Sequence, residues 1–267
     1  MGSIRIDLTP DRCGYWFVIN RGQILLTNDS DPVVPFGVWS ALALPAASSA
    51  IQLAEFDGHP CYLVIDDDQR AETSQWQSVR SLLSDEDPFW FLTAARATQL
   101  ALFLQTHRYC GQCGHAMQEV DWELATHCHR CQHRCYPRIS PCVLVAVRRP
   151  GEILLARSAR HKAGLYSIVA GFVESGETLE QAAIREVLEE TGIQITNLRY
   201  MGSQPWPFPH SLMAGFIADY VAGDIVCQPN EIEDAAWFSV HKLPQIPPLA
   251  TLSGQMIAAV VAQESSY

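Results

Sequence analysis

No run of apolar residues in this chain reaches the ~18 to 20 residues that a membrane-spanning helix requires. The first residues, MGSIRIDLTP, lack the basic region and apolar core of a secretory signal. Internal repeats and low-complexity segments are also absent. We therefore expect neither a helical membrane anchor nor a repeat array, and we expect a cytoplasmic protein with no membrane partner.

Acidic residues are missing between residues 124 and 151, although the whole chain has 29 Asp and Glu against 18 Lys and Arg, for a net charge of −11. The net charge argues against a general nucleic-acid-binding protein, because such proteins gain affinity by neutralising phosphates. The acid-free segment forms an arginine strip, which predicts either a surface that attracts a phosphate-rich substrate or a solvated face. Its members are Arg130, Arg134, Arg138, Arg148 and Arg149.

One stretch of the chain, residues 171–193, reads GFVESGETLEQAAIREVLEETGI and fits the pattern G-x5-E-x7-R-E-U-x-E-E-x-G-U, where U is apolar. The pattern puts Glu186, Glu189 and Glu190 on one face of a helix, because residues three and four apart are neighbours there. Like charges this close destabilise a bare helix. The cluster therefore indicates a site for a divalent cation such as Mg²⁺ or Mn²⁺, which prefers carboxylate and phosphate oxygens.

Local signals set the bounds of that helix. Thr178 and Gln181 have the spacing of a capping box, and Gly192 stands where a left-handed terminal residue belongs. We therefore expect a helix over about residues 178–191. Residues 166–174 are rich in β-branched and aromatic types and predict a strand, so that the unit is strand, loop and helix.

Ten residues beyond the box, residues 203–211 read SQPWPFPHS, with proline at alternate positions. Proline fixes φ and removes backbone donors, so this array predicts a stiff extended loop that is neither helix nor central strand. The loop would present Trp206 and Phe208. By itself the array is also compatible with a polyproline ligand or a packed corner.

Four cysteines form two C-x2-C pairs separated by fourteen residues: Cys110, Cys113, Cys128 and Cys131. This spacing is typical of a zinc ribbon, in which four thiolates close a tetrahedral shell and stabilise the fold, with one Zn²⁺ per chain. Two disulfides or a redox pair are the alternatives. Four nearby histidines are possible substitutes for a cysteine, although we expect them on the surface: His115, His127, His129 and His133.

The box resembles the Nudix hydrolases, and the proline array and four-Cys site resemble the NADH pyrophosphatase branch of that family. The resemblance implies a homodimer that hydrolyses the pyrophosphate of NADH or NAD⁺ to nicotinamide mononucleotide and AMP, and that removes NAD caps from RNA 5′ ends. A broader pyrophosphatase acting on ADP-ribose or dinucleoside polyphosphates is the alternative in the same class. A zinc-ribbon nucleotide or RNA sensor with an inactive Nudix domain is another, although the intact REVLEE sequence speaks against it.

The resemblance also implies roles for particular residues. Glu186, Glu189 and Glu190 would be catalytic, and the catalytic metal would be held by Glu186, Glu190, Glu231 and the carbonyl of Ala170. Structural positions would be Gly171, Gly192 and the ion pair of Arg185 with Glu177. The implied substrate contacts are Arg80, Glu123, Tyr136, Phe172, Gln204, Pro205, Trp206, Pro207, Phe208, Pro209, His210, Ser211 and Ser253.

With 267 residues, of which 48% are hydrophobic and 18% charged, the chain is long enough for about two domains. We expect an α+β protein: a Nudix α/β/α sandwich, implied by the resemblance, preceded by a four-Cys zinc ribbon and a small β-rich N-terminal domain. The expected bounds are 1–107 for the N-terminal domain with its linker helix, 108–136 for the ribbon and 137–267 for the Nudix domain. Expected strands are 15–19, 23–26, 61–65, 142–147, 153–157, 212–220 and 235–238, and further helices are 87–108 and 252–263.

Overall fold

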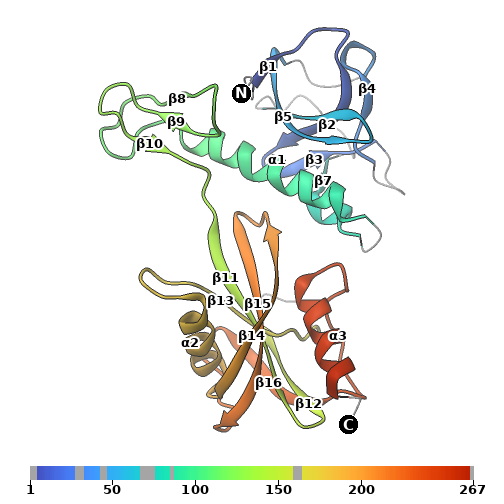
Figure 1. Cartoon of the computed structure of the whole chain (residues 1–267), viewed down its shortest axis with the longest axis vertical. Helices are drawn as coiled ribbons and strands as arrows, with labels where there is room; N and C mark the ends of the chain where they lie inside the picture. The colour runs from blue at the N-terminus through green and yellow to red at the C-terminus, as the bar shows by residue number, and fades with distance from the viewer. Residues whose placement is uncertain are drawn as a thin grey trace. The chain divides into compact units, whose positions relative to one another are not determined.

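The structure is a computed structural model that describes residues 5–27, 33–42, 47–66, 76–84, 87–158 and 164–264. The chain divides into two compact units (Figure 1). The first, the N-terminal unit, comprises residues 1–138 together with 207–209. The second comprises residues 139–206 and 210–267 and is called the catalytic unit after the role that the sequence predicts for it. The expected division into three domains at 107 and 136 stays a prediction.

The N-terminal unit begins with a seven-stranded sheet in the order β1-β5-β6-β2-β3-β7, with β4 paired to β2. The parallel pairing of β2 with β6 places Trp16 beside Tyr62, and both side chains are buried in the core of this sheet. The predicted strands at 15–19, 23–26 and 61–65 are confirmed, whereas the remaining four were not predicted. The strands are β1 (Arg5–Asp7), β2 (Cys13–Asn20), β3 (Gln23–Leu25), β4 (Phe36–Val38), β5 (Ser49–Phe56), β6 (His59–Ile65) and β7 (Trp76–Ser78), with short 3-10 helices at Trp39–Ala41 and Val79–Leu82.

Helix α1 (Pro88–Thr106) follows this sheet, in agreement with the sequence. Its first turn is capped because the Asp87 carboxylate accepts the Phe89 N–H at 2.9 Å, and Pro88 occupies a first-turn position where no donor is needed. Phe91 and Phe103 lie on its buried side. No helix in the described part of the chain is long and apolar enough to cross a membrane.

The ribbon consists of three short antiparallel strands, β8 (Gln118–Glu119), β9 (Thr126–His127) and β10 (Arg134–Cys135), in the order β10-β9-β8. Its two C-x2-C turns have the same backbone hydrogen bond. The Gly114 N–H donates to the Cys110 carbonyl at 2.8 Å, and the Gln132 N–H donates to the Cys128 carbonyl at 2.8 Å. Both donor residues have positive φ, which closes each turn tightly around its sulfurs.

The catalytic unit is a sheet in the order β14-β15-β11-β12-β16, with β13 paired to β11, and one helix on each face (Figure 1). Alternate residues of β11 point to opposite faces, so Val143 and Val145 pack under α2 while Leu144 and Ala146 pack under α3. The expected α/β/α sandwich is confirmed. Its elements are β11 (Ser140–Arg149), β12 (Glu152–Ser158), β13 (Val169–Phe172), α2 (Leu179–Thr191), β14 (Gln194–Trp206), β15 (Ser211–Ala222), β16 (Ile232–Ser239) and α3 (Leu252–Glu264).

The proline array departs from its expected form. Residues 203–206 are not loop but the end of β14, a strand that the sequence did not predict, and Pro205 lies opposite Leu212 of β15. The array tolerates strand geometry because β14 is an edge strand, where a missing N–H leaves no ladder bond unmade. Only residues 207–210 form the turn that connects β14 to β15.

Candidate active site

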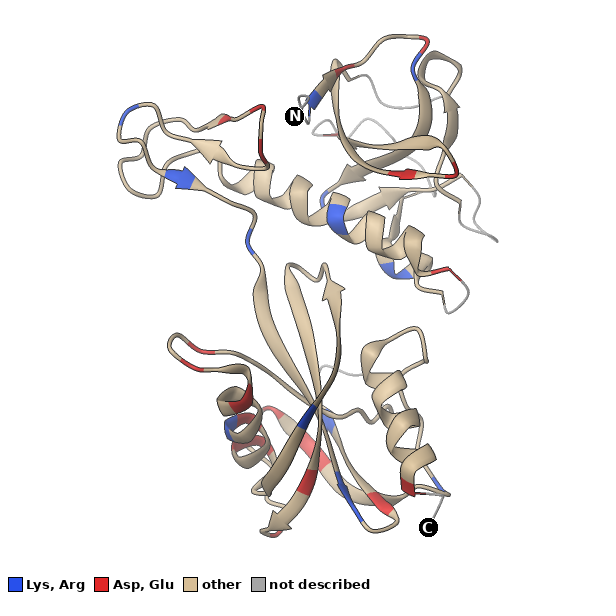
Figure 2. Cartoon of the chain, viewed as in Figure 1, with Lys and Arg blue, Asp and Glu red and all other residues tan. Residues whose placement is uncertain are grey.

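Helix α2 carries the three clustered carboxylates, and both of its ends are fixed by local hydrogen bonds. The Thr178 hydroxyl accepts the Gln181 N–H, and the Gln181 side chain accepts the Thr178 N–H at 2.8 Å, which completes the predicted capping box. Gly192 ends the helix with a φ of 74°. Figure 2 colours acidic (red) and basic (blue) positions along this helix.

Gly171 on β13 allows Glu186 to lie directly against the sheet. A Cβ atom built at this position would lie 1.8 Å from the Cδ atom of Glu186, far inside van der Waals contact. Strand β13 is itself held to β11, with Gly171 opposite Val143. Glycine is therefore required here by close approach rather than by backbone angle.

A cavity of about 390 Å³ opens between β13, α2 and the start of β16. Four carboxylates line it, from Glu174, Glu186, Glu190 and Glu231, and Ala170 and Phe172 are part of the same wall. The fold thus brings together residues more than fifty positions apart in the chain. All four residues expected to hold the catalytic metal lie at one cavity.

Burial and mutual repulsion raise the proton affinity of two of these carboxylates. Glu190 is only 7% exposed, and burial, followed by the charges of Glu186 and Glu231, raises its pKa to about 8. Burial also raises the pKa of Glu186, although the Arg185 guanidinium partly offsets this. A donor set of closely spaced carboxylates whose charges repel one another fits a hard divalent cation, which neutralises them and accepts their oxygens.

Arg185 fastens the loop before the helix to the helix itself. Its Nε and Nη2 atoms donate to the two carboxylate oxygens of Glu177 at 2.6 and 2.9 Å, and Nη2 also donates to the Phe172 carbonyl at 2.9 Å. Its hydrogen bonds lower the pKa of Glu177 to about 2, and the pair in turn raises the pKa of Arg185. A two-pronged ion pair of this kind gives the loop a defined geometry.

Glu189 differs from its two neighbours on α2. Its side chain is 51% exposed, and its carboxylate accepts a hydrogen bond from Arg185 at 3.2 Å. It is not among the residues that line the acidic cavity. Its expected catalytic role stays a prediction.

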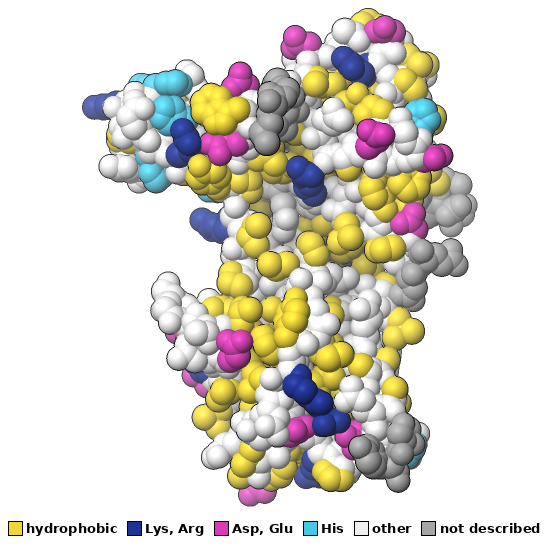
Figure 3. All heavy atoms as spheres, viewed as in Figure 1, with side chains coloured by type: hydrophobic (Ala, Val, Ile, Leu, Met, Phe, Trp, Pro, Cys, Tyr) yellow, Lys and Arg dark blue, Asp and Glu magenta, His cyan; other side chains and the backbone are white. Residues whose placement is uncertain are grey.

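The four ribbon cysteines form a compact sulfur cluster, with all four Sγ atoms within 4.8 Å of one another. The Sγ atoms of Cys110 and Cys131 are 3.6 Å apart, and those of Cys113 and Cys128 are 3.5 Å apart. A tetrahedral zinc site with Zn–S bonds of about 2.3 Å requires separations of roughly 3.8 Å. These sulfurs therefore fit one structural zinc, and no histidine is needed to complete the shell. Histidine side chains are seen on the ribbon surface in Figure 3.

Several expected substrate contacts lie in the N-terminal unit. The Arg80 guanidinium carbon is 4.1 Å from the ring centroid of Phe208, a cation–π contact that holds the turn of the proline array. Glu123 accepts hydrogen bonds from Arg134 at 2.9 Å and from the Tyr136 hydroxyl at 3.5 Å. The Tyr136 ring is 53% exposed and is thus available for stacking.

The remaining expected contacts lie in the catalytic unit or in the turn, residues 207–210. Phe172 is 54% exposed at the acidic cavity. The Gln204 amide accepts the Leu252 N–H at 2.8 Å and donates to the Ala250 carbonyl at 2.9 Å, so it anchors the start of α3. The other members are Pro205 and Trp206 at the end of β14, Pro207 and Pro209 in the turn, His210 against Ser140, Ser211 buried in β15, and Ser253 against Thr251. Their roles in substrate binding stay predictions.

Two of the cavity residues that were not recognised from the sequence carry ionisable side chains. Glu174 belongs to the variable stretch after the box glycine, and no pattern distinguishes it from a solvated acid. Cys142 had the default interpretation of a small apolar residue, but it lies opposite Phe172 in the sheet and lines the cavity. Burial, followed by the charges of Glu186 and Glu190, raises the pKa of its thiol to about 12, so it is a neutral wall residue.

Comparison with known proteins agrees with this geometry. The NUDIX domain family matches residues 138–260, and the family described as the NADH pyrophosphatase zinc ribbon domain matches residues 105–136. The chain is 46% identical over 260 residues to the NAD-capped RNA hydrolase NudC of Pectobacterium atrosepticum, and the alignment covers 97% of this chain and 96% of that protein. It is 46% identical over 255 residues to the NAD-capped RNA hydrolase NudC of Haemophilus influenzae (strain PittEE), which covers 94% of both proteins.

The sandwich with its acidic helix and the ribbon with its four cysteines define a Nudix hydrolase. Within this class, sequence identity to the NudC proteins along nearly the whole chain decides the family. The chain belongs to the family of Nudix proteins that includes the NAD-capped RNA hydrolases NudC.

Proposed function

We propose that this protein hydrolyses the pyrophosphate bond of NADH and NAD⁺, giving AMP together with reduced nicotinamide mononucleotide from NADH and nicotinamide mononucleotide from NAD⁺, and that it removes NAD caps from RNA 5′ ends. The observation that carries the proposal is the convergence of Glu186, Glu190 and Glu231 on one cavity. Relatives that match the chain along its length bear the name NAD-capped RNA hydrolase NudC, and the matching ribbon family is described by NADH pyrophosphatase activity.

Glu186, Glu190, Glu231 and the carbonyl of Ala170 would hold Mg²⁺ or Mn²⁺ at this cavity. When bound, such a cation neutralises the pyrophosphate, polarises phosphorus and increases the acidity of a coordinated water. The burial of Glu190 keeps solvent away from that side chain. The cavity is also lined by the aliphatic side chains of Ile168, Val169 and Ile232, and these together with the partly exposed Phe172 ring would receive a nucleotide base beside the phosphates.

The chain's own residues supply orientation. The contact of Glu186 with Gly171 fixes one carboxylate, and the ion pair of Arg185 with Glu177 fixes the loop that forms the cavity rim. Glu189, which is half exposed, would exchange its hydrogen bond with Arg185 for one with a water molecule and accept a proton from that water. Glu174 extends the acidic rim and would orient an outer phosphate-bound cation or water.

We further propose a homodimer in which Tyr136 of one subunit completes the nucleotide site of the other. The support is the exposure of both Tyr136 and Phe172, two aromatic rings that are able to stack on a substrate ring from opposite sides. Light scattering on the purified protein tests the stoichiometry. Complementation of a Tyr136→Ala chain with a Glu190→Gln chain tests the shared site: mixed dimers should regain activity when each subunit supplies the residue that the other lacks.

Product analysis tests the activity. Purified zinc-loaded protein is incubated with Mg²⁺ or Mn²⁺ and with NADH, NAD⁺ or NAD-capped RNA, and the products are separated by chromatography. Nicotinamide mononucleotide together with AMP, or with 5′-phosphorylated RNA, supports the proposal. Faster turnover of ADP-ribose or dinucleoside polyphosphates would instead identify a broader pyrophosphatase, and tight binding without turnover of any substrate would identify a sensor.

A further inference from the structure

A second cavity, of about 460 Å³, lies in the N-terminal unit and shares no residue with the acidic cavity. It is formed by β1, β5 and β6 of the sheet, the end of α1, and β8 and β9 of the ribbon. Its volume is in the range of small-molecule sites, which occur preferentially where separate structural layers meet. None of the roles assigned above uses this cavity.

The cavity has a cationic end. His107 and Arg108 lie where α1 gives way to the ribbon, and both line the wall. The Nδ1 atom of His107 lies 3.2 Å from the Phe103 carbonyl and 3.0 Å from the Thr106 hydroxyl, so Nδ1 carries a proton for these bonds, and Nε2 would take up a second proton to donate to a phosphate oxygen. Arg108 is exposed at the rim, where its guanidinium matches the oxygens of a phosphate.

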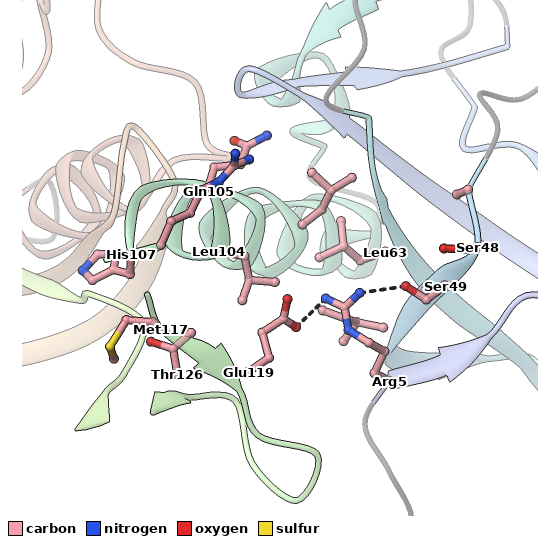
Figure 4. A pocket seen from close by; sticks show the side chains of 15 residues that line it. Arg5, Ser48, Ser49, Leu63, Leu104, Gln105, His107, Met117, Glu119 and Thr126 are labelled. Carbon is pink, nitrogen blue, oxygen red and sulfur yellow. Dashed lines mark hydrogen bonds and ion pairs between the residues drawn. The ribbon is translucent and has the colours of Figure 1, made fainter. Parts of the chain in front are cut away.

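An ion pair crosses the middle of the cavity. Arg5 of β1 pairs with Glu119 of β8 and donates to the Ser49 hydroxyl of β5 at 2.7 Å, as Figure 4 shows. Glu119 repels an anion at this point, so an anionic group is directed to the His107 and Arg108 end. Ser48 and Ser49 leave hydroxyl groups at the other end, suited to the polar edge of a base.

The floor of the cavity is apolar. The side chains of Leu63, Leu104 and Met117 lie around it in Figure 4, and Met117 is able to pack against a flat ring. The hydroxyl of Thr126, also in the wall, is buried and has no hydrogen-bond partner among the described residues. A buried hydroxyl group ordinarily has a hydrogen-bond partner, so this wall lacks a partner that a ligand or a bound water would supply.

We propose that this cavity binds a nucleoside monophosphate unit, with its phosphate at His107 and Arg108, its base on Leu104 and Met117, and its sugar between the two. The choice of a mononucleotide among phosphorylated ligands rests on the proposed function, whose reaction produces one. The unit comes either from free nucleotide or from the body of an RNA substrate. Occupancy links the sheet, α1 and the ribbon in the region where Arg5 and Glu119 already join them.

Photolabelling tests the proposal independently of turnover. The zinc-loaded full chain is illuminated with 8-azidoadenosine 5′-monophosphate, and the labelled residues are located by fragment-ion mass spectrometry. We expect label in residues 104–107 or 117–119, separate from any label near Phe172. Unlabelled AMP and a 5′-phosphorylated RNA oligonucleotide are competitors. Protection by AMP alone identifies free nucleotide as the source, and protection by the oligonucleotide at lower concentration identifies RNA.

Two variants and one matched control test whether the nucleotide binds in this cavity. Leu104→Trp fills the floor, and Arg108→Gln removes a rim charge without a change in the core, so at least one of them should fold normally. Each should raise the concentration of half-maximal cavity labelling by about tenfold, the effect of one lost charge-assisted contact. Arg130→Gln, an exposed ribbon arginine outside the cavity, should leave it unchanged. Absence of label at these residues, or label that neither variant weakens, overturns the proposal even if the protein proves to be an active NADH pyrophosphatase.

Discussion

The sulfur cluster of the ribbon and the acidic cavity of the catalytic unit are suited to metal in different ways, one as a closed site and the other as an open one. Four sulfurs in the ribbon fit a closed tetrahedron, with two of their separations at 3.5 and 3.6 Å. The carboxylates surround about 390 Å³ of open space, and one of them, Glu190, has a pKa raised to about 8. A closed shell leaves no position for substrate, so its metal stabilises the fold. Carboxylates that repel one another around an open cavity are stabilised by a bound cation, and the same cation can also bind a phosphate of the substrate.

The largest expected effect is on chemistry at the open site. Glu190→Gln keeps the shape of the side chain and removes a charge that would hold metal, so turnover should fall by ~10² or more. Steady-state kinetics with NADH at saturating Mg²⁺ measures this, and zinc content serves as the control for the other site. Turnover close to that of the unaltered protein would remove Glu190 from the site.

The addition of one methyl group at Gly171 should lower turnover by nearly as much. Gly171→Ala puts a Cβ atom where the Glu186 carboxylate lies, so this carboxylate must move and turnover should fall by about 10-fold to 10²-fold. Gly111→Ala in the ribbon is the matched control, since a Cβ atom there meets nothing within 4 Å. Equal activity of the two variants would show that the position of Glu186 against the sheet is unimportant.

The closed site should respond through stability. Cys128→Ser removes one thiolate, so bound zinc should fall from about one per chain and the ribbon should lose order, with a smaller change in the chemical step of the molecules that stay folded. Metal analysis and thermal unfolding measure these effects. Cys13→Ser, at an exposed cysteine outside the cluster, is the control. A zinc-free variant with an unchanged melting curve contradicts the structural role.

The open site should also make stability depend on pH when no divalent cation is added. The folded protein raises the pKa of Glu190 from 4.5 to about 8, so between these values it binds more protons than the unfolded chain. The free energy of unfolding should therefore be greatest near pH 4.5 and should decrease by a few kcal/mol as the pH rises toward about 8. Denaturant unfolding from pH 5 to 8 measures this. Glu190→Gln should flatten the profile, and added Mg²⁺ should restore stability at pH 8.

The smallest expected effect concerns the arginine strip, which the structure divides. Arg148 pairs with Asp219 and Glu264, and Arg149 pairs with Glu152 and lies over Trp237. Arg134 pairs with Glu123, so Arg130 and Arg138 remain as candidates for RNA phosphates, and Arg138 is the nearer of the two to β11 along the chain. Arg138→Gln should lower the salt dependence of NAD-RNA decapping by about one phosphate contact and leave NADH hydrolysis unchanged. Arg149→Gln is the control. Equal salt dependence of both substrates would make the strip a solvated face.

Prediction from sequence was most successful where the information is local. The bounds of α2, the Asp87 cap of α1 and the set of four cysteines depend on residues within a few positions of one another. Strand β14 was not predicted: its one proline, Pro205, disfavours a strand, and only its place at the sheet edge makes this residue tolerable. The short strands β1 and β4 carry too few residues for a recognisable pattern.

The sequence by itself determined the class of chemistry, because a run of carboxylates at helical spacing and four paired cysteines admit few ligands other than metals. Tertiary structure alone decided which acids share a site. It brings Glu231 and Glu174 to Glu186 and Glu190, directs Glu189 to Arg185, and places Cys142 in the cavity wall. It also decided the proton affinity of Glu190, since that depends on burial and on charges supplied by distant parts of the chain.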